Sequence, residues 1–108
     1  MAIVGANRAA YGTLTSNTST DTVVATQWVT CSAHIDSGTG TITWEFKGPD
    51  GVWRTLYGGA DNTTAQAYTA SHVVTFEFGD DVEIRGTVSS ASSLQLDYQI
   101  FSNLRNRN

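Results

Sequence analysis

Residues able to do acid–base or nucleophilic chemistry are few and scattered along this sequence. The two histidines, His34 and His72, have no second histidine at the H-x-H or H-x-x-x-H spacing, and we expect both at the protein surface. A zinc site needs three or four converging ligands, and a cysteine nucleophile needs a histidine within reach. The single cysteine, Cys31, falls at an apolar strand position, where we expect a buried structural thiol.

The carboxylates suggest two further chemistries, and neither pattern is complete. Glu45 and Glu77 lie in separate expected strands and are the pair from which a glycosidase site would be built. Asp80, Asp81 and Glu83 cluster at an expected turn, but they lack the D-x-D-x-D-G spacing of a calcium loop. We therefore predict no catalytic residue, no metal site and no cofactor, and a protein that is not an enzyme.

The aromatic residues favour binding over catalysis. Trp28, Trp53 and Tyr57 are candidates for an exposed aromatic face, because exposed Trp and Tyr rings stack on sugars and anchor protein interfaces. Packing inside the protein is the alternative for each of them. Trp44 and Phe46 alternate with polar residues and are expected in the core.

Composition limits the class of partner. The chain has 108 residues, which is the size of one domain. Six Lys and Arg against ten Asp and Glu argue against a nucleic-acid partner, which requires a basic surface. No apolar run reaches the length of a membrane span, so no membrane partner is expected. The beginning of the chain lacks the pattern of a signal peptide and no disulfide can form, which favours synthesis in the cytoplasm.

The elements that must position these residues are strands. Sixteen Thr favour strands, while ten Ser and ten Gly favour turns. Alternation of apolar and polar residues predicts strands over 11–15, 22–35, 41–47, 52–57, 66–69, 73–78, 82–88 and 94–100.

Turn-forming residues separate the expected strands. They occupy positions 36–40, 48–51 and 89–93, and the segment Gly48-Pro-Asp-Gly51 is the strongest turn signal in the chain. We predict an all-β, single-domain antiparallel β-sandwich of seven to eight short strands, with jelly-roll topology or, alternatively, immunoglobulin-like topology. Residues 1–10 form an expected flexible N-terminal arm, 11–101 the sandwich domain, and 102–108 a polar C-terminal tail.

The hairpin from Gly40 to Leu56, with its Pro-Asp-Gly turn followed by Trp53, resembles a hairpin of small tailed-bacteriophage virion proteins. The stretch from Val73 to Val88, the serine-rich turn and the following L-x-L-x-Y strand resemble the closing strands of phage capsid decoration (cement) proteins. The resemblance covers about residues 40–101.

This resemblance implies a structural virion protein, made in the host cytoplasm, that binds the outer capsid surface and stabilises the head. It implies the major capsid protein as partner and a homo-dimer or homo-trimer as the bound form. Arg8, Tyr11, Arg105 and Arg107 are then candidate contacts to the capsid or another partner. The alternative is a carbohydrate- or receptor-binding β-sandwich module of a phage fibre or tail, which would use the aromatic face.

Overall fold

The computed structural model describes residues 8–58 and 63–103, so the expectations for Arg105, Arg107 and most of both terminal segments lie outside the described residues. The described residues form strands and no helix, which confirms the all-β class and the antiparallel sheets. The strands are β1 (Ala9–Leu14), β2 (Val23–Ala25), β3 (Trp28–Lys47), β4 (Trp53–Thr55), β5 (Tyr57–Gly58), β6 (Thr64–Ala65), β7 (Ala67–Tyr68), β8 (His72–Glu77) and β9 (Val82–Asn103).

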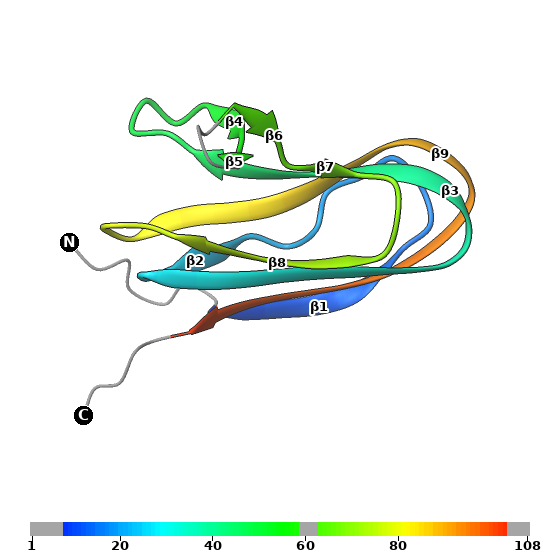
Figure 1. The fold of residues 1–108 in the computed structure, drawn as a ribbon, viewed down its shortest axis with the longest axis horizontal. Coiled ribbons are helices and arrows are strands. Elements are labelled where there is room, and N and C mark those ends of the chain that lie inside the picture. The colour runs from blue at the N-terminus through cyan, green and yellow to red at the C-terminus, as the bar shows by residue number, and fades with distance from the viewer. Residues whose placement is uncertain (1–7, 59–62, 104–108) are drawn as a thin grey trace.

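Two long strands, β3 of 20 residues and β9 of 22, organise the molecule. They pair antiparallel along their whole length, from Trp28 opposite Asn103 to Phe46 opposite Ile84. Both strands bend back together, so that the two halves of each strand lie in two different layers (Figure 1). The expectation of short strands is wrong for these two.

The first layer contains β1, the second half of β9, the first half of β3, and β8 alongside β3 (Figure 1). β8 is linked to β3 by a 3.2 Å hydrogen bond between the hydroxyls of Thr30 and Thr75, and Ser71, directly before β8, accepts a 2.8 Å bond from Ile35 N through its Oγ. The second layer contains β2, the first half of β9, the second half of β3, and β4 and β7. A separate small sheet joins β5 and β6.

The bend explains why the turns expected at 36–40 and 89–93 are wrong. Both segments stay within their strands, and the pairing register shifts between Ile35 and Thr41. Gly38, Ser90 and Ser93 take positive φ angles of 77°, 56° and 49° there. A Cβ on Gly38 would lie 2.1 Å from the Ser93 carbonyl oxygen, so only glycine fits. Such bulged residues let a strand curve sharply without ending its pairing.

The other expected turn is confirmed. Gly51 N donates to Gly48 O at 2.9 Å, Gly51 has a φ of 80°, and β4 returns beside the end of β3. The single strand expected over 22–35 is wrong, because it breaks at Gln27, whose φ is 68°. That break sends β2 into the second layer and β3 into the first.

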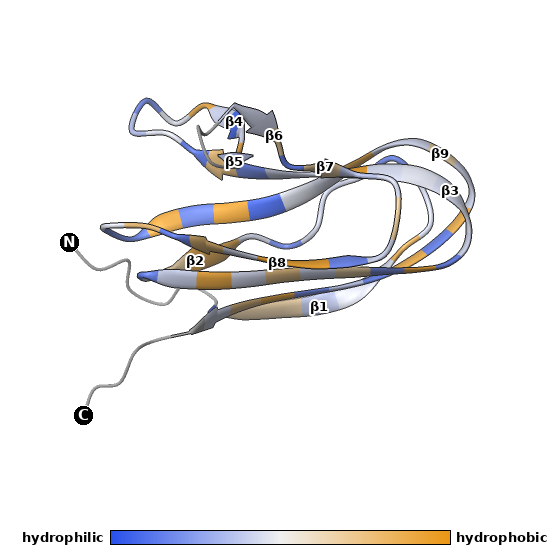
Figure 2. Cartoon of the chain, in the orientation of Figure 1, coloured by the Kyte–Doolittle hydropathy of each residue, from blue (hydrophilic) through white to orange (hydrophobic). Residues whose placement is uncertain are grey.

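The core lies between the two layers, and hydropathy alternates along β9 as expected for strands with one buried side (Figure 2). Trp44 is completely buried, and Gly86 lies against it, where a Cβ would lie 2.7 Å from the indole ring. Burying each aliphatic core side chain stabilises the fold by about 1.5–3 kcal/mol. The other fully buried large side chains are Ile42, Ile84, Leu96, Ile100, Val23 and Val29.

Strands β1 and β9 reach slightly beyond residues 11 and 101, the limits that we expected for the sandwich domain. Ala9 and Ala10 already pair with Phe101 and Ile100, and β9 continues to Asn103. The residues before Tyr11 are small and alternate too weakly to predict the start of a strand. Backbone pairing with β9 stabilises the strand there.

Candidate functional site

The outer face of the first layer is the most distinctive surface of the described residues. Side chains alternate along its strands, so every second residue points away from the core. In the pairing register, Tyr11 of β1 lies opposite Gln99 of β9, which lies opposite Ser32 of β3. The next row is Thr13, Asp97 and His34. We call this surface the outer face; it comprises Ala9, Tyr11, Thr13, Trp28, Thr30, Ser32, His34, Val73, Thr75, Glu77, Asp97, Gln99 and Phe101.

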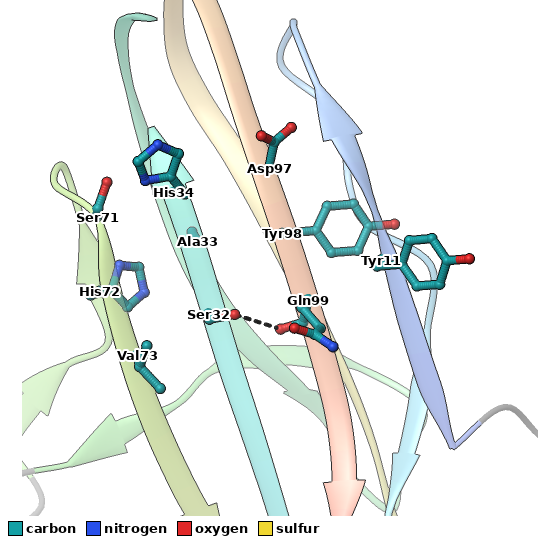
Figure 3. Close-up of a pocket in the computed structure, with 10 residues that line it drawn as sticks. All are labelled: Tyr11, Ser32, Ala33, His34, Ser71, His72, Val73, Asp97, Tyr98 and Gln99. Carbon is teal, nitrogen blue, oxygen red and sulfur yellow. Dashed lines mark hydrogen bonds between the residues drawn. The ribbon is translucent and has the colours of Figure 1, made fainter. Parts of the chain in front are cut away.

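A hollow of about 700 Å³ crosses the outer face. Its sides are formed by Tyr11 of β1 and by Val73 of β8, and the small side chain of Ser32 leaves the space between them (Figure 3). A second hollow of about 250 Å³ continues along the same strands past Ser32 to Phe101. The face is therefore a shallow groove and not a closed cavity.

Large apolar side chains are unusually exposed here. Tyr11 is 81% exposed, Val73 72% and Phe101 51%. Single exposed apolar residues are normal on a protein surface. Here Tyr11 and Phe101 lie on adjacent strands and Val73 lies across the groove from them, and such a grouping on one sheet face is typical of an interaction surface. The sequence contains this signal, because in a strand over 73–78 the apolar Val74 and Phe76 fall on one side and Val73 on the other.

Over the described residues the outer face carries few charges, and those at its hollows are not cationic side chains of Lys or Arg. No lysine or arginine lines either hollow among the described residues, and Asp97 is the one carboxylate in the lining. Asp97 Oδ1 accepts a hydrogen bond of 2.7 Å from Thr13 Oγ1. His34 lies in the same row and is largely exposed. The lining therefore suits a neutral surface or ligand and offers no cation to bind a phosphate.

The outer side of the second layer is different, because its charges pair with one another. Arg85 Nε donates to Glu45 Oε1 at 2.9 Å, and its guanidinium lies 4.2 Å from the centre of the Trp53 ring. Lys47 Nζ lies 3.9 Å from Glu83 Oε2. A solvated surface of mutually paired charges is a poorer docking site than a face with few charges and exposed apolar groups.

The expected aromatic face of Trp28, Trp53 and Tyr57 is not formed. Val29 of β3 points into the core, so its neighbour Trp28 points to the outer side of the first layer. Trp53 lies on β4, in the second layer. Trp53 and Tyr57 do line one shallow hollow, and Tyr57 is 54% exposed. Alternation within single strands does not reveal which layer a strand enters, so the sequence could not separate these rings.

The candidate contact Arg8 is engaged within the fold. Its guanidinium Nη1 donates to Thr26 Oγ1 at 2.7 Å and to Val24 O at 3.3 Å, which ties the start of β1 to β2. Arg8 is half-buried and holds these two strands together, and its role as a partner contact stays a prediction. Tyr11, in contrast, is exposed and lines the groove.

His72 is not the surface histidine that we expected. It is half-buried, and its Nε2 accepts a 2.8 Å hydrogen bond from the indole Nε1 of Trp44. Its Nδ1 lies 2.9 Å from Ala70 O, to which it donates in the neutral tautomer. Its ring stacks on Tyr68 with centroids 3.7 Å apart. Burial lowers the pKa of His72, and the hydrogen bond to Ala70 opposes this only in part.

The Tyr68 hydroxyl extends this polar cluster by donating to Gln66 Oε1 at 2.6 Å. Gln66 is buried, and its Nε2 donates to Thr64 O at 3.1 Å. The spacing of these residues along the chain carries no motif. Only the pairing of β7 with β3 brings them next to Trp44, so sequence reasoning missed the cluster.

The remaining chemical candidates do not assemble into a site. Cys31 is buried, and desolvation raises the pKa of its thiol to about 12. Glu45 lies in the second layer and Glu77 ends β8 beside the first, so they do not form a pair. Asp81 accepts a hydrogen bond from Thr26. Among the described residues, no three His, Cys, Asp or Glu side chains are grouped to hold a metal.

Comparison with protein-family models, curated proteins and solved structures finds no match for this chain. In the part of the chain that the structure describes, no helix is long and apolar enough to cross a membrane.

Proposed function

We propose that this protein is a non-enzymatic structural protein of a bacteriophage particle, which binds the outer capsid surface as a decoration (cement) protein. The observation that carries the proposal is the outer face, which has few charged groups and has Tyr11, Val73 and Phe101 exposed on it. Exposed apolar groups on a rigid sheet are the elements from which a protein interface is built. The partner would be the major capsid protein, and the site of action the virion surface after synthesis in the host cytoplasm.

The order of the strands supports this proposal. We propose that the fold is an eight-stranded jelly-roll β-sandwich in which β3 and β9 each supply two consecutive strands. In one sheet the order is β1, the second half of β9, the first half of β3 and then β8. In the other sheet the order is β2, the first half of β9, the second half of β3 and then β4 together with β7. Jelly rolls are common in viral capsid proteins and in lectins. This part of the argument is an analogy between folds.

The placement of the chain ends is also consistent with docking at this layer. Ser102 N donates to Arg8 O at 2.8 Å, so both ends of the described chain leave the first layer at neighbouring points. These two described ends therefore lie next to Ala9 and Phe101 of the outer face. The buried area across neighbouring capsid subunits, and not a chemical step, would then stabilise the particle.

The test is co-sedimentation of the purified protein with capsids that lack it. Val73→Lys places a charge in the groove and should weaken capsid binding at least about tenfold. Val52→Lys is the matched control, because Val52 is also exposed but lies after the Gly48–Gly51 turn, away from the outer face. Binding of the folded Val73→Lys variant at wild-type strength would refute the proposed surface, and no binding of the wild type would refute the function.

A saccharide-binding module is the second candidate. The observation that favours it is the exposed Tyr11 ring beside Asp97, Gln99 and His34 in the same hollow, since an aromatic platform flanked by hydrogen-bonding groups fits a neutral sugar. Binding of the wild type to neutral glycans on an array, lost in Val73→Lys, would favour this candidate over capsid binding.

A further inference from the structure

The strand β1 leaves one edge of the first layer open. Among the described strands β1 pairs with β9 alone, through six consecutive residue pairs without a bulge. Its sequence, Ala-Ala-Tyr-Gly-Thr-Leu, contains no charged residue and no proline. Proteins usually protect an exposed edge strand with a charge, a proline or a bulge, because an unprotected edge pairs with other strands. β8 is equally long, but it ends in Glu77 and so carries a protecting charge.

The register shows which backbone groups of β1 point outward. Ser102 N donates to Arg8 O at 2.8 Å, so Arg8 and Ser102 form a hydrogen-bonded pair. Such pairs alternate along an antiparallel ladder, so Ala10, Gly12 and Leu14 also point toward β9.

The backbone N–H and C=O groups of Ala9, Tyr11 and Thr13 therefore point away from β9. All three residues are exposed, and no described strand pairs with this side of β1. Their side chains lie on the outer face, so a strand that pairs here also extends that face.

We propose that a second copy of this chain pairs with β1 through its own β1, antiparallel, about a two-fold axis that passes through Tyr11. Tyr11 then lies opposite Tyr11 of the other copy, and Ala9 lies opposite Thr13. Each of these pairs exchanges two backbone hydrogen bonds, which gives about six in total. The two first layers become one continuous sheet.

A second copy fits this edge better than another protein, because the edge is complementary to itself. A two-fold axis places each residue of the strand against the same strand, so any charge near the axis would face its own sign. The chain as a whole carries a net charge of −4, which repels a second copy elsewhere, but β1 is uncharged. Opposed tyrosines are a favourable cross-strand pair.

The dimer has a consequence for the outer face. It places two grooves side by side on one extended sheet, with the tyrosines between them. Its interface is smaller than the ~1,000 Å² of a stable complex, so we expect a micromolar dissociation constant. The dimer is independent of the identity of the partner that the outer face binds.

The first test is the mass of the full chain by sedimentation equilibrium, from low to high micromolar concentration. The wild type should pass from monomer to dimer. Tyr11→Pro should stay monomeric with an unchanged circular dichroism spectrum, because position 11 donates no hydrogen bond to β9. Tyr11→Thr, which keeps the outward N–H, is the matched control and should still dimerise. A wild-type monomer or trimer at high concentration, or a dimer of Tyr11→Pro, would overturn the proposal.

The second test does not require that β1 still forms with a proline at position 11. Tyr11→Cys should form a disulfide-linked dimer on mild oxidation, because the two Cα atoms of such a pair lie about 5.5 Å apart, within disulfide reach. Val73→Cys is the matched control, since Val73 is similarly exposed on the far strand of the same layer. Cys31 is buried and does not compete. Crosslinking of Tyr11→Cys at least about tenfold faster than Val73→Cys supports the proposal, and equal rates refute it.

Discussion

Replacing His72 by phenylalanine should destabilise the protein by leaving the buried Trp44 indole without its acceptor. The indole Nε1 donates to His72 Nε2 at 2.8 Å, and Trp44 is completely buried. A buried donor that loses its partner costs about 1–3 kcal/mol. Phenylalanine keeps an aromatic ring stacked on Tyr68, so the loss should come mainly from the hydrogen bond.

For a domain of this size, 1 kcal/mol corresponds to a shift of about 4 °C in the melting temperature, so we expect His72→Phe to melt about 4–12 °C lower. The measurement is thermal and urea unfolding followed by circular dichroism. The matched control is a double-mutant cycle with Trp44→Phe, which removes the donor instead of the acceptor. A coupling energy below about 0.5 kcal/mol between the two substitutions would refute the role of this bond.

The same contact makes stability depend on pH. Burial lowers the pKa of folded His72 below its ordinary value of 6.5, so between these two values the unfolded chain binds more protons than the folded one. Stability should therefore be greatest above pH 6.5 and fall as the pH decreases below it. Trp44, Tyr68 and Ala70 surround the ring and supply no compensating carboxylate. A His72→Phe variant that keeps the full pH dependence between 7.5 and 5.5 would contradict this account.

Three further predictions concern the bend, the hairpin and the buried thiol. Gly38→Ala should lower the free energy of unfolding by more than about 2 kcal/mol, because a Cβ there would lie 2.1 Å from the backbone. Gly51 has a similar φ but open space around it, so Gly51→Ala should lower this free energy by about 1–2 kcal/mol. Equal losses for the two variants in urea unfolding would contradict the crowding at Gly38. The Arg54 guanidinium donates to Asp50 at 2.8 and 2.9 Å and, with a weaker contribution from the Val52 N–H, holds the pKa of that carboxyl well below its usual range. The NMR signal of Asp50 should therefore remain that of a carboxylate at pH 3, and its pKa should rise toward the usual range in Arg54→Gln. Because burial raises the pKa of the Cys31 thiol, Cys31 should react with a thiol reagent at pH 8 at least about a thousandfold more slowly in the folded chain than in the urea-unfolded chain. Rapid labelling of the native protein would instead show that the interior opens locally.

Local patterns predicted the features that local physics determines. The alternation around Trp44 and in the last strand placed the buried residues correctly, and the Gly48–Gly51 turn formed as its residues require. Each of these features depends on neighbours within a few residues. The sequence is therefore sufficient to predict the all-β class and most inward positions.

Features that depend on distant pairing were not predictable. Glycine and serine at 36–40 and 89–93 are typical of turns, but here two such segments lie opposite each other and bend two strands together. Whether Trp28 and Trp53 share a surface depends on the layer that each strand enters. His72, at the start of β8 in the first layer, meets Trp44, in the second half of β3, only through the tertiary fold. The alternation of each strand is enough to predict which residues point to the outer face. The groove could not be predicted, because it depends on which residues of neighbouring strands lie opposite one another.

The continuous course of β3 and β9 through both layers also determines how the protein folds. Trp28 pairs with Asn103 and Phe46 with Ile84, so almost every pair in this ladder joins residues far apart in the chain. Such high contact order slows folding to milliseconds or seconds. Neither layer has a long strand of its own, so one layer cannot form and persist while the other is open. We expect folding to be a single cooperative transition, with similar protection from hydrogen exchange in both halves of each long strand.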